Sequence, residues 1–208
     1  MNAAYSRTQR LLEVCSIGAF ALFGSWGAWR LALIAGWQLA PILLVALPLG
    51  WLASDLVSGL VHWACDSWGS ANTPVVGQAF IRPFREHHED PQAMTRHDFV
   101  ETNGSSCFAS LPVLIAAGLM PLENLVWMTA QAFLLSLSVG VLATNQCHKW
   151  AHMTDAAIPP LAGWAQRYRL SLPRRHHALH HMPPYNTHFC ISSGWLNSLF
   201  NAVLRWWR

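Results

Sequence analysis

The sequence predicts an all-α, polytopic membrane protein with four transmembrane helices and a histidine-rich cap on the cytoplasmic side. Three observations lead to this prediction: an apolar composition, long stretches without charged residues, and an uneven distribution of Lys and Arg. Of the 208 residues, 53% are hydrophobic, only 11% are charged and twelve are Trp, which lies outside the usual range of soluble domains. By its length, the chain is expected to form a single membrane-embedded domain over residues 1–208.

Stretches without charge predict the spans, since a helix needs about 20 apolar residues to cross a bilayer. Three stretches meet this requirement without any Asp, Glu, Lys or Arg: Leu31–Ser54, Thr102–Leu122 and Asn124–Cys147. A fourth, weaker stretch is Val14–Trp29, bounded by Glu13 and Arg30. Tilting of this helix or snorkelling of the arginine would allow it to span as well.

The distribution of basic residues predicts the orientation. With four spans, Arg30 falls in the first short loop and Glu123 in the second, and the other twelve Lys and Arg residues lie on the opposite face with both termini. The positive-inside rule assigns that face to the cytoplasm, which in a bacterium places the protein in the inner membrane. The net charge of +3 is too small to imply a nucleic-acid partner.

Ten of the eleven histidines fall on this same predicted face, which indicates a common site. Ionisable residues at membrane depth are costly unless they serve a function, and imidazole is the commonest metal ligand among side chains. His188 stands apart from the clusters and is interpreted as a structural residue. The ten candidate metal ligands are His62, His87, His88, His97, His148, His152, His176, His177, His180 and His181.

The spacing of these histidines supports metal binding, because residues three or four apart share one face of a helix. His62 is followed four residues later by Asp66, a candidate ligand or a partner that orients a ligand imidazole. His148 and His152 are also four apart, and His177, His180 and His181 form a third set. The adjacent His87 and His88 are expected to supply at least one ligand. No catalytic residue beyond the metal ligands is predicted.

Ten imidazoles are too many for one tetrahedral ion, so two metal ions with open positions fit the count. Nitrogen ligation with few carboxylates favours iron over magnesium or calcium, although the affinity order alone does not exclude zinc. Five scattered cysteines without a CxxC pair argue against a disulfide scaffold and against a thiolate site. Three arginines near the clusters are candidates for binding a lipid phosphate, or for satisfying the positive-inside bias alone: Arg85, Arg174 and Arg175.

Five motifs resemble the Kua-type lipid desaturase family over about residues 50 to 197. They are DLVSGLVHWACDSWGS (Asp55–Ser70), FIRPFREHHEDPQAMTRHDFVETNG (Phe80–Gly104), NQCHKWAH (Asn145–His152), LPRRHHALHH (Leu172–His181) and FCISSGWLN (Phe189–Asn197). Their length makes the resemblance specific. His188 lies outside the family's histidine pattern.

The resemblance implies an integral-membrane di-iron enzyme that uses O₂ as co-substrate and two external electrons. In the plasmalogen branch of the family, a 1-O-alkyl (plasmanyl) phospholipid becomes a 1-O-alk-1′-enyl (plasmenyl) phospholipid. Because the sequence carries no haem, ferredoxin or dinucleotide motif, the electrons are expected from a separate cytochrome b5-like or ferredoxin-like protein. The implied partners are thus a membrane phospholipid and this electron donor.

Three alternative functions remain open at this point. Desaturation of a phospholipid acyl chain near its carboxyl end is the reaction of the plastid branch. Hydroxylation of a lipid shares the first hydrogen abstraction and differs in the fate of the oxygen. A histidine-rich metal transporter is disfavoured, since it would need polar residues through the membrane midplane and the stretches Thr102–Leu122 and Asn124–Cys147 offer few.

Overall fold

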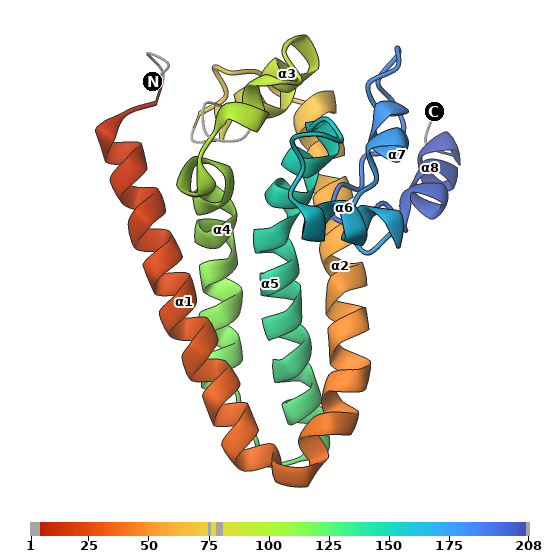
Figure 1. Ribbon diagram of the computed structural model, residues 1–208. Coiled ribbons are helices and arrows are strands. Elements are labelled where there is room, and N and C mark those ends of the chain that lie inside the picture. The colour runs from red at the N-terminus through yellow and green to blue at the C-terminus, as the bar shows by residue number, and fades with distance from the viewer. Residues whose placement is uncertain (1–4, 75, 78–80, 207–208) are drawn as a thin grey trace. The chain divides into compact units, whose positions relative to one another are not determined.

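The computed structural model describes residues 5–74, 76–77 and 81–206, and these residues form helices and loops without a strand. In chain order the helices are α1 (Arg7–Ala35), η1 (Gly36–Gln38), α2 (Leu39–Ser67), α3 (Arg82–Glu89), η3 (Ala93–Arg96), α4 (Phe99–Leu119), α5 (Leu125–His152), α6 (Pro160–Arg167), α7 (Arg174–Ala178) and α8 (Asn197–Trp206) (Figure 1). The prediction of an all-α protein is therefore confirmed.

Three helical stretches of the described chain are long and apolar enough to cross a membrane: Arg7–Ser67, Phe99–Leu119 and Leu125–His152. The first contains both α1 and α2, which η1 separates. The predicted span Leu31–Ser54 is wrong in its bounds, because Gly36 ends α1 within it at a φ of 51°. A positive φ is readily adopted by glycine, and a run without charge gives no sign of such a turn.

Arg30 lies inside α1 and not in the first loop, where the charge pattern placed it. Its guanidinium donates hydrogen bonds to the carbonyls of Gly118 and Met120 at the end of α4. The last carbonyls of a helix lack partners within the helix and carry a partial negative charge, so a cation there is stabilising. Glu123 lies between α4 and α5, as predicted.

The chain divides into two compact units, and α2 and α5 contribute residues to both. Unit 1 comprises Met1–Ser54 and Asp98–Asn145, and unit 2 comprises Asp55–His97 and Gln146–Arg208. In unit 1 a Cβ at Gly50 would lie 2.4 Å from Ser136 Cβ, so the close packing of α2 on α5 requires glycine there. The apolar core of unit 1 consists of Leu31, Ala35, Ile42, Ala46, Leu122, Met128 and Ala132.

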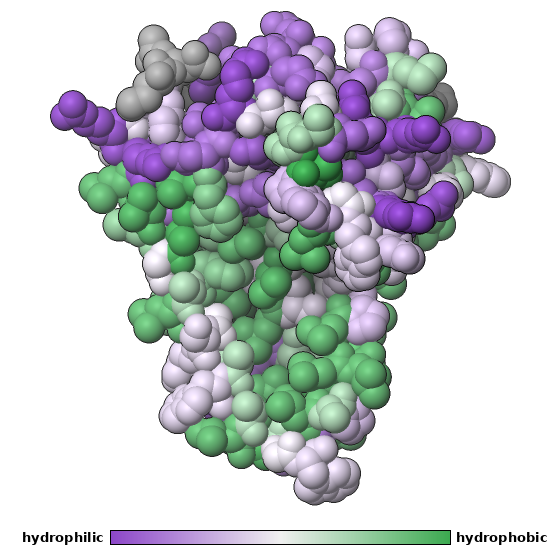
Figure 2. Space-filling view, viewed as in Figure 1, coloured by the Kyte–Doolittle hydropathy of each residue, from purple (hydrophilic) through white to green (hydrophobic). Residues whose placement is uncertain are grey.

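The long helices of unit 1 also expose much apolar surface. On the face shown in Figure 2, hydrophobic residues cover these helices. Leu44 on α2 and Val126 on α5 are 78% and 76% exposed. An apolar surface of this extent suits lipid and not water, in agreement with the candidate spans.

Unit 2 contains all the predicted metal ligands. Two small apolar clusters support them. One packs Phe189, Cys190, Phe200 and Leu204 against Trp63 and Leu196, and the other packs Ala151, Leu172 and Ile191 against Phe84. Both clusters include residues of the segment 187–197, which follows the last histidine pair and contributes directly to the site.

Candidate metal centre

Eight of the predicted ligands converge in unit 2 in two groups. In each group, one possible ligand atom per residue lies within 4.8 Å of all the others. The His148 group consists of His87, His148, His152, His177 and His181. The His62 group consists of His62, His87, His88 and His180. His87 belongs to both groups, so its imidazole lies between them.

Four short stretches supply these side chains. α2 provides His62, α3 provides His87 and His88, and the C-terminal end of α5 provides His148 and His152. Neighbours in sequence seldom face one site, yet the rings of His87 and His88 have centroids 4.4 Å apart and both belong to the His62 group. α7 ends at Ala178, so His180 and His181 lie in the turn that follows it and not on the helix itself.

The ring nitrogens of the His148 group crowd around one point. His177 Nε2 lies 2.8 Å from His148 Nε2, 2.9 Å from His152 Nε2 and 3.0 Å from His181 Nε2. His152 Nε2 and His148 Nε2 are 3.2 Å apart. A ring nitrogen either donates one hydrogen or offers one lone pair, so His177 Nε2 cannot make three hydrogen bonds at once. Hydrogen bonding alone does not explain this arrangement.

A metal ion does explain it. Two nitrogen ligands about 2.1 Å from one ion, at roughly 90–109° to each other, lie about 3.0–3.4 Å apart, which is close to the distances in the His148 group. In the described part of the chain, several buried atoms also have no hydrogen-bond partner, among them His62 Nε2, Asp66 Oδ1 and His87 Nε2. Buried polar atoms are normally satisfied. The donor set therefore fits metal ions at both groups.

The His62 group is built around a carboxylate. Asp66 Oδ2 lies 3.1 Å from His88 Nε2, 3.4 Å from His62 Nε2 and 3.5 Å from His180 Nε2. The Nε2 atoms of His180 and His88 are 3.3 Å apart. His62 and Asp66 were predicted to share one face of a helix. In the structure they meet at the same point, where one carboxylate oxygen lies among three imidazoles.

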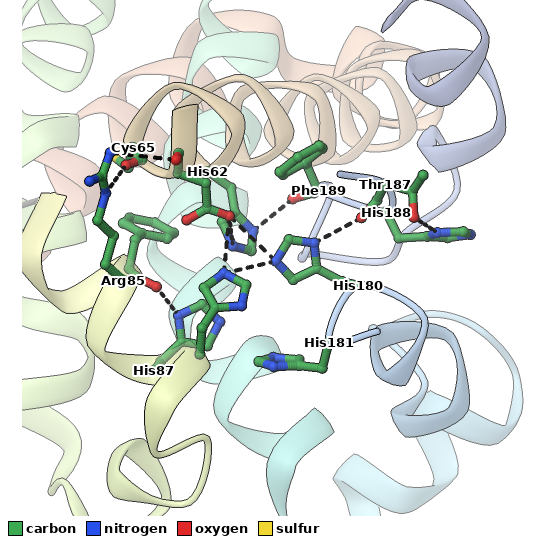
Figure 3. A network of polar contacts seen from close by, with 12 residues as sticks. His62, Cys65, Arg85, His87, His180, His181, Thr187, His188 and Phe189 are labelled. Carbon is green, nitrogen blue, oxygen red and sulfur yellow. Dashed lines mark hydrogen bonds and ion pairs between the residues drawn. The ribbon is translucent and has the colours of Figure 1, made fainter. Parts of the chain in front are cut away.

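Backbone carbonyls orient three of the four imidazoles of the His62 group (Figure 3). His62 Nδ1 donates to the Phe189 carbonyl at 3.1 Å, and His180 Nδ1 donates to the Thr187 carbonyl at 2.8 Å. His87 Nδ1 donates to the Phe84 carbonyl. Each bond fixes the hydrogen on Nδ1 and turns the lone pair of Nε2 toward the centre, as in known metal-ligating histidines.

Burial keeps the imidazoles of His87, His177 and His181 neutral. Burial and the neighbouring His62 hold the pKa of His87 well below its usual range, and burial and His152 do the same for the pKa of His177. The pKa of His181 falls to about 3 through burial and the nearby His152 and His180. Neutral imidazole is the form that binds metal. These groups therefore offer lone pairs at physiological pH.

Two predicted ligands lie outside both groups. His97 follows η3, and its carbonyl accepts a hydrogen bond from the Lys149 amine. His176 Nε2 accepts a hydrogen bond from Asn197 Nδ2 at 2.9 Å, and its ring packs edge-on against His188 at 5.0 Å. The structure thus brings eight of the ten predicted histidines together. The spacing of the histidines in the sequence does not show which eight converge and which two, His97 and His176, lie outside.

The predicted phosphate-binding arginines have different surroundings. Arg85 donates from Nε to the Cys65 carbonyl at 3.2 Å and from Nη2 to the Trp68 carbonyl at 3.4 Å. It therefore caps the end of α2 directly beside Asp66. Arg174 is exposed and lies 3.9 Å from Asp155, and Arg175 is exposed as well.

Sequence reasoning missed how the segment 187–197 is held. Asp55 on α2 is fully buried, and Oδ1 accepts from the backbone N–H groups of Ser193 at 2.8 Å and Gly194 at 2.9 Å. Ser192 and Leu196 donate to the same carboxylate at 3.2 and 3.1 Å. Asp55 directly follows the uncharged stretch Leu31–Ser54 in the sequence, which gives no sign of its hydrogen-bond partners.

Asn197 and Gly59 complete this attachment. Asn197 pairs with the backbone of Cys190, accepting from its N–H at 2.8 Å and donating to its carbonyl at 3.0 Å. A Cβ at Gly59 would lie 2.5 Å from Cys190 Sγ, so the segment 187–197 occupies the space beside this glycine. The carbonyls of Thr187 and Phe189 are thereby fixed beside the imidazoles.

Comparisons with known proteins agree with this site. The model of the lipid desaturase domain matches residues 51–208. The chain is 46% identical over 205 residues to a plasmanylethanolamine desaturase of Myxococcus xanthus, covering 96% of this chain and 70% of the relative. It is 42% identical over 217 residues to plasmanylethanolamine desaturase 1 of Mus musculus, covering 100% of this chain and 78% of the relative.

A more distant relative is a chloroplastic protein of Arabidopsis thaliana, fatty acid desaturase 4. It is 37% identical over 155 residues, which cover 72% of this chain and 45% of that protein. No solved structure matches the chain. The matched residues 51–208 contain both histidine groups. The chain belongs to the lipid desaturase family, and it is an integral membrane oxidoreductase.

Proposed function

We propose that this chain is a di-iron desaturase that converts a 1-O-alkyl (plasmanyl) phospholipid with an ethanolamine headgroup into the 1-O-alk-1′-enyl (plasmenyl) form. The convergence of eight imidazoles around two points supports the metal chemistry. Identities of 46% and 42% to relatives named plasmanylethanolamine desaturase support the choice of substrate. Residues 1–208 are proposed to act as one membrane-embedded domain.

The proposed iron ligands are the eight histidines of the two groups, with Asp66 as a ninth ligand or an orienting partner. His97 and His176 remain predictions from spacing alone. When bound, two irons would activate O₂, which is the oxidant for the removal of two hydrogens. One alkyl ether, one O₂, two electrons and two protons give one vinyl ether and two waters. A separate cytochrome b5-like or ferredoxin-like protein is proposed to deliver the electrons.

The protein's own part is to hold nitrogen donors, exclude water and position the lipid. Phe84 and Phe189 pack against His62 with ring centroids 4.9 and 5.7 Å away, which keeps this side of the centre dry. His88 and His181 are half-buried and Tyr185 is 40% exposed, so we place the approach of the substrate on their side. The ether oxygen activates the adjacent C–H bond because it stabilises an electron-poor carbon.

The proposed topology has four spans, both termini in the cytoplasm and the histidine centre at the cytoplasmic surface. The motivation is the distribution of charge: Arg30 and Glu123 lie near the two short connections, and the other twelve Lys and Arg residues lie on the opposite predicted face. Reporter fusions at Trp37 in η1 and at Glu123 are expected to lie outside the cytoplasm. A cytoplasmic signal from either position would contradict the topology and the common face of the histidines.

The reaction is tested by supplying an alkyl ether phospholipid, O₂ and a reducing system to membranes that contain the protein. We expect an acid-labile vinyl ether to form, as detected by lipid mass spectrometry before and after acid treatment. Replacing both Arg174 and Arg175 by Gln should mainly weaken the use of substrate, since positioning is lost and oxygen activation is retained. A double bond in an acyl chain, without any vinyl ether, would move the assignment to the acyl-chain reaction.

A further inference from the structure

The two short helices near the C-terminal end of unit 2 expose apolar residues on the side opposite to their packed face. On α8, Asn197, Phe200 and Leu204 are buried. Leu199, Val203 and Trp206 are 63%, 51% and 91% exposed. At 100° per residue these three share one face, which points away from the buried one. α8 thus carries large apolar side chains on two opposite sides.

α6 has the same organisation. Ala162 is its buried residue, while Leu161 and Trp164 are 76% and 52% exposed. Tyr168, directly after the helix, is 59% exposed, and its ring lies 5.2 Å from that of Trp164. These three residues also lie on one face of the helix. Without a cover, such aromatic and leucine side chains would face water at a considerable hydrophobic cost.

Trp195 joins the two exposed faces. Its indole Nε1 donates a hydrogen bond, 2.6 Å long, to the carbonyl of Arg169, the residue directly after Tyr168. Trp195 is 46% exposed. Trp195 itself lies two residues before α8. We call these exposed residues together the aromatic strip: Leu161, Trp164, Tyr168, Trp195, Leu199, Val203 and Trp206.

The charge around the aromatic strip has one sign. Residues 156–208 include six Arg and no Asp or Glu. Arg167 and Arg169 lie beside the α6 part of the strip and Arg205 lies beside the α8 part, and all three are exposed. Trp and Tyr interleaved with Arg and Leu are typical of helices that lie in the headgroup region of a bilayer. The arginines complement anionic headgroups.

The strip also lies in the same unit as a lipid-facing surface. The part of α2 in unit 2 belongs to a candidate span, and it exposes Leu56, Val57, Leu60 and Val61. α8 packs near this part of α2, since the rings of Phe200 and Trp63 are 6.5 Å apart. A membrane around α2 therefore comes close to α8.

We propose that α6 and α8 are interfacial helices, which insert the aromatic strip into the headgroup region of the membrane and bind anionic lipid through the flanking arginines. This proposal does not depend on the reaction. The strip anchors unit 2 at the depth where a phospholipid headgroup meets its upper chain.

Spin labels on single cysteines test the proposal. The background variant is Cys15→Ser, because Cys15 is an exposed free cysteine while the other four are buried. Labels are attached to Leu161→Cys, Leu199→Cys and Val203→Cys, and the protein is placed in nanodiscs with and without phosphatidylglycerol. Ser198→Cys is the matched control, since it is exposed on α8 outside the strip. Power saturation then compares the access of O₂ and of a water-soluble nickel chelate.

We expect the three strip labels to be more accessible to O₂ than to the nickel chelate, and the Ser198 label to show the opposite. Phosphatidylglycerol should increase the difference for the strip, and Arg167→Gln with Arg205→Gln should remove this increase. Strip labels as open to nickel as the Ser198 label would overturn the proposal. Shielding that arises only on addition of an acidic electron-transfer protein would assign the strip to that partner instead. None of these measurements requires turnover, so they stand apart from any result of the desaturase assay.

Discussion

Replacing His180 by Ala is expected to abolish desaturation while the protein still inserts into the membrane. The His180 ring is fully buried, and its Nε2 lies 3.3 Å from His88 Nε2 and 3.5 Å from Asp66 Oδ2. Its removal takes a nitrogen donor from the His62 group. Loss of a partner that merely orients a ligand costs about 10- to 100-fold in activity or metal affinity, so loss of a proposed ligand should exceed about 100-fold.

The measurement combines vinyl ether formation with iron content per chain. We expect two irons in the active wild type and fewer in His180→Ala. His188→Ala is the matched control, because His188 is near in sequence but lies outside both histidine groups, and its activity should be largely intact. Wild-type turnover in His180→Ala would refute the proposed ligand set. An active wild type with a single metal ion, or with zinc alone, would refute the di-iron assignment.

Replacing Asp55 by Ala is expected to cause the largest loss of stability. The carboxylate accepts four backbone N–H bonds from the segment 187–197 in a fully buried position. An unsatisfied buried donor costs about 1–3 kcal/mol, so four of them would remove several kcal/mol from the free energy of unfolding. Since domains have only about 5–15 kcal/mol in total, we expect poor accumulation or a much lower unfolding temperature.

Two further variants distinguish the loss of the carboxylate's hydrogen bonds from a general destabilisation by any substitution in this region. Asp55→Asn can keep one acceptor oxygen for three of the donors and should fall between Ala and wild type. Ser58→Ala loses the hydrogen bond from the Ile191 N–H, 3.0 Å long, and should cost about 1–3 kcal/mol, because one buried donor is left without a partner where Asp55→Ala leaves four. The checks are thermal unfolding in detergent and iron content. Wild-type stability and iron loading in Asp55→Ala would show that the segment is held in another way.

The helical class could be predicted from the length of the uncharged stretches, and the candidate ligands could be predicted from their spacing along the chain. Residues three or four apart meet on one helical face, so His62 with Asp66 and His148 with His152 were predicted as pairs. The turn at Gly36 was missed, since it lies within a stretch that is apolar on both sides of it. An uncharged stretch indicates that a segment is long and apolar enough to lie in lipid. It does not indicate where the backbone turns back within that segment.

The remaining part of the site could not be predicted because it depends on contacts between distant residues. The sequence treats His176 and His177 alike, yet only His177 reaches the other imidazoles, while His176 turns to Asn197. Likewise, the sequence shows Asp55 at the end of the uncharged stretch Leu31–Ser54, but its four N–H partners lie about 140 residues further along the chain. Such pairings arise only when the segment 187–197 returns to α2.

The carbonyl-oriented imidazoles have a consequence for mutational scanning. The Phe84, Thr187 and Phe189 oxygens that receive the Nδ1 hydrogens belong to the backbone, which every amino acid carries. A scan of single substitutions would therefore score Thr187 as tolerant even though its carbonyl sets the tautomer of His180. Sensitivity should instead appear at Asp55, Gly59 and Asn197, none of which is a proposed ligand. In such a scan, the backbone carbonyls that orient the imidazoles would be detected only through the side chains that hold the main chain in place.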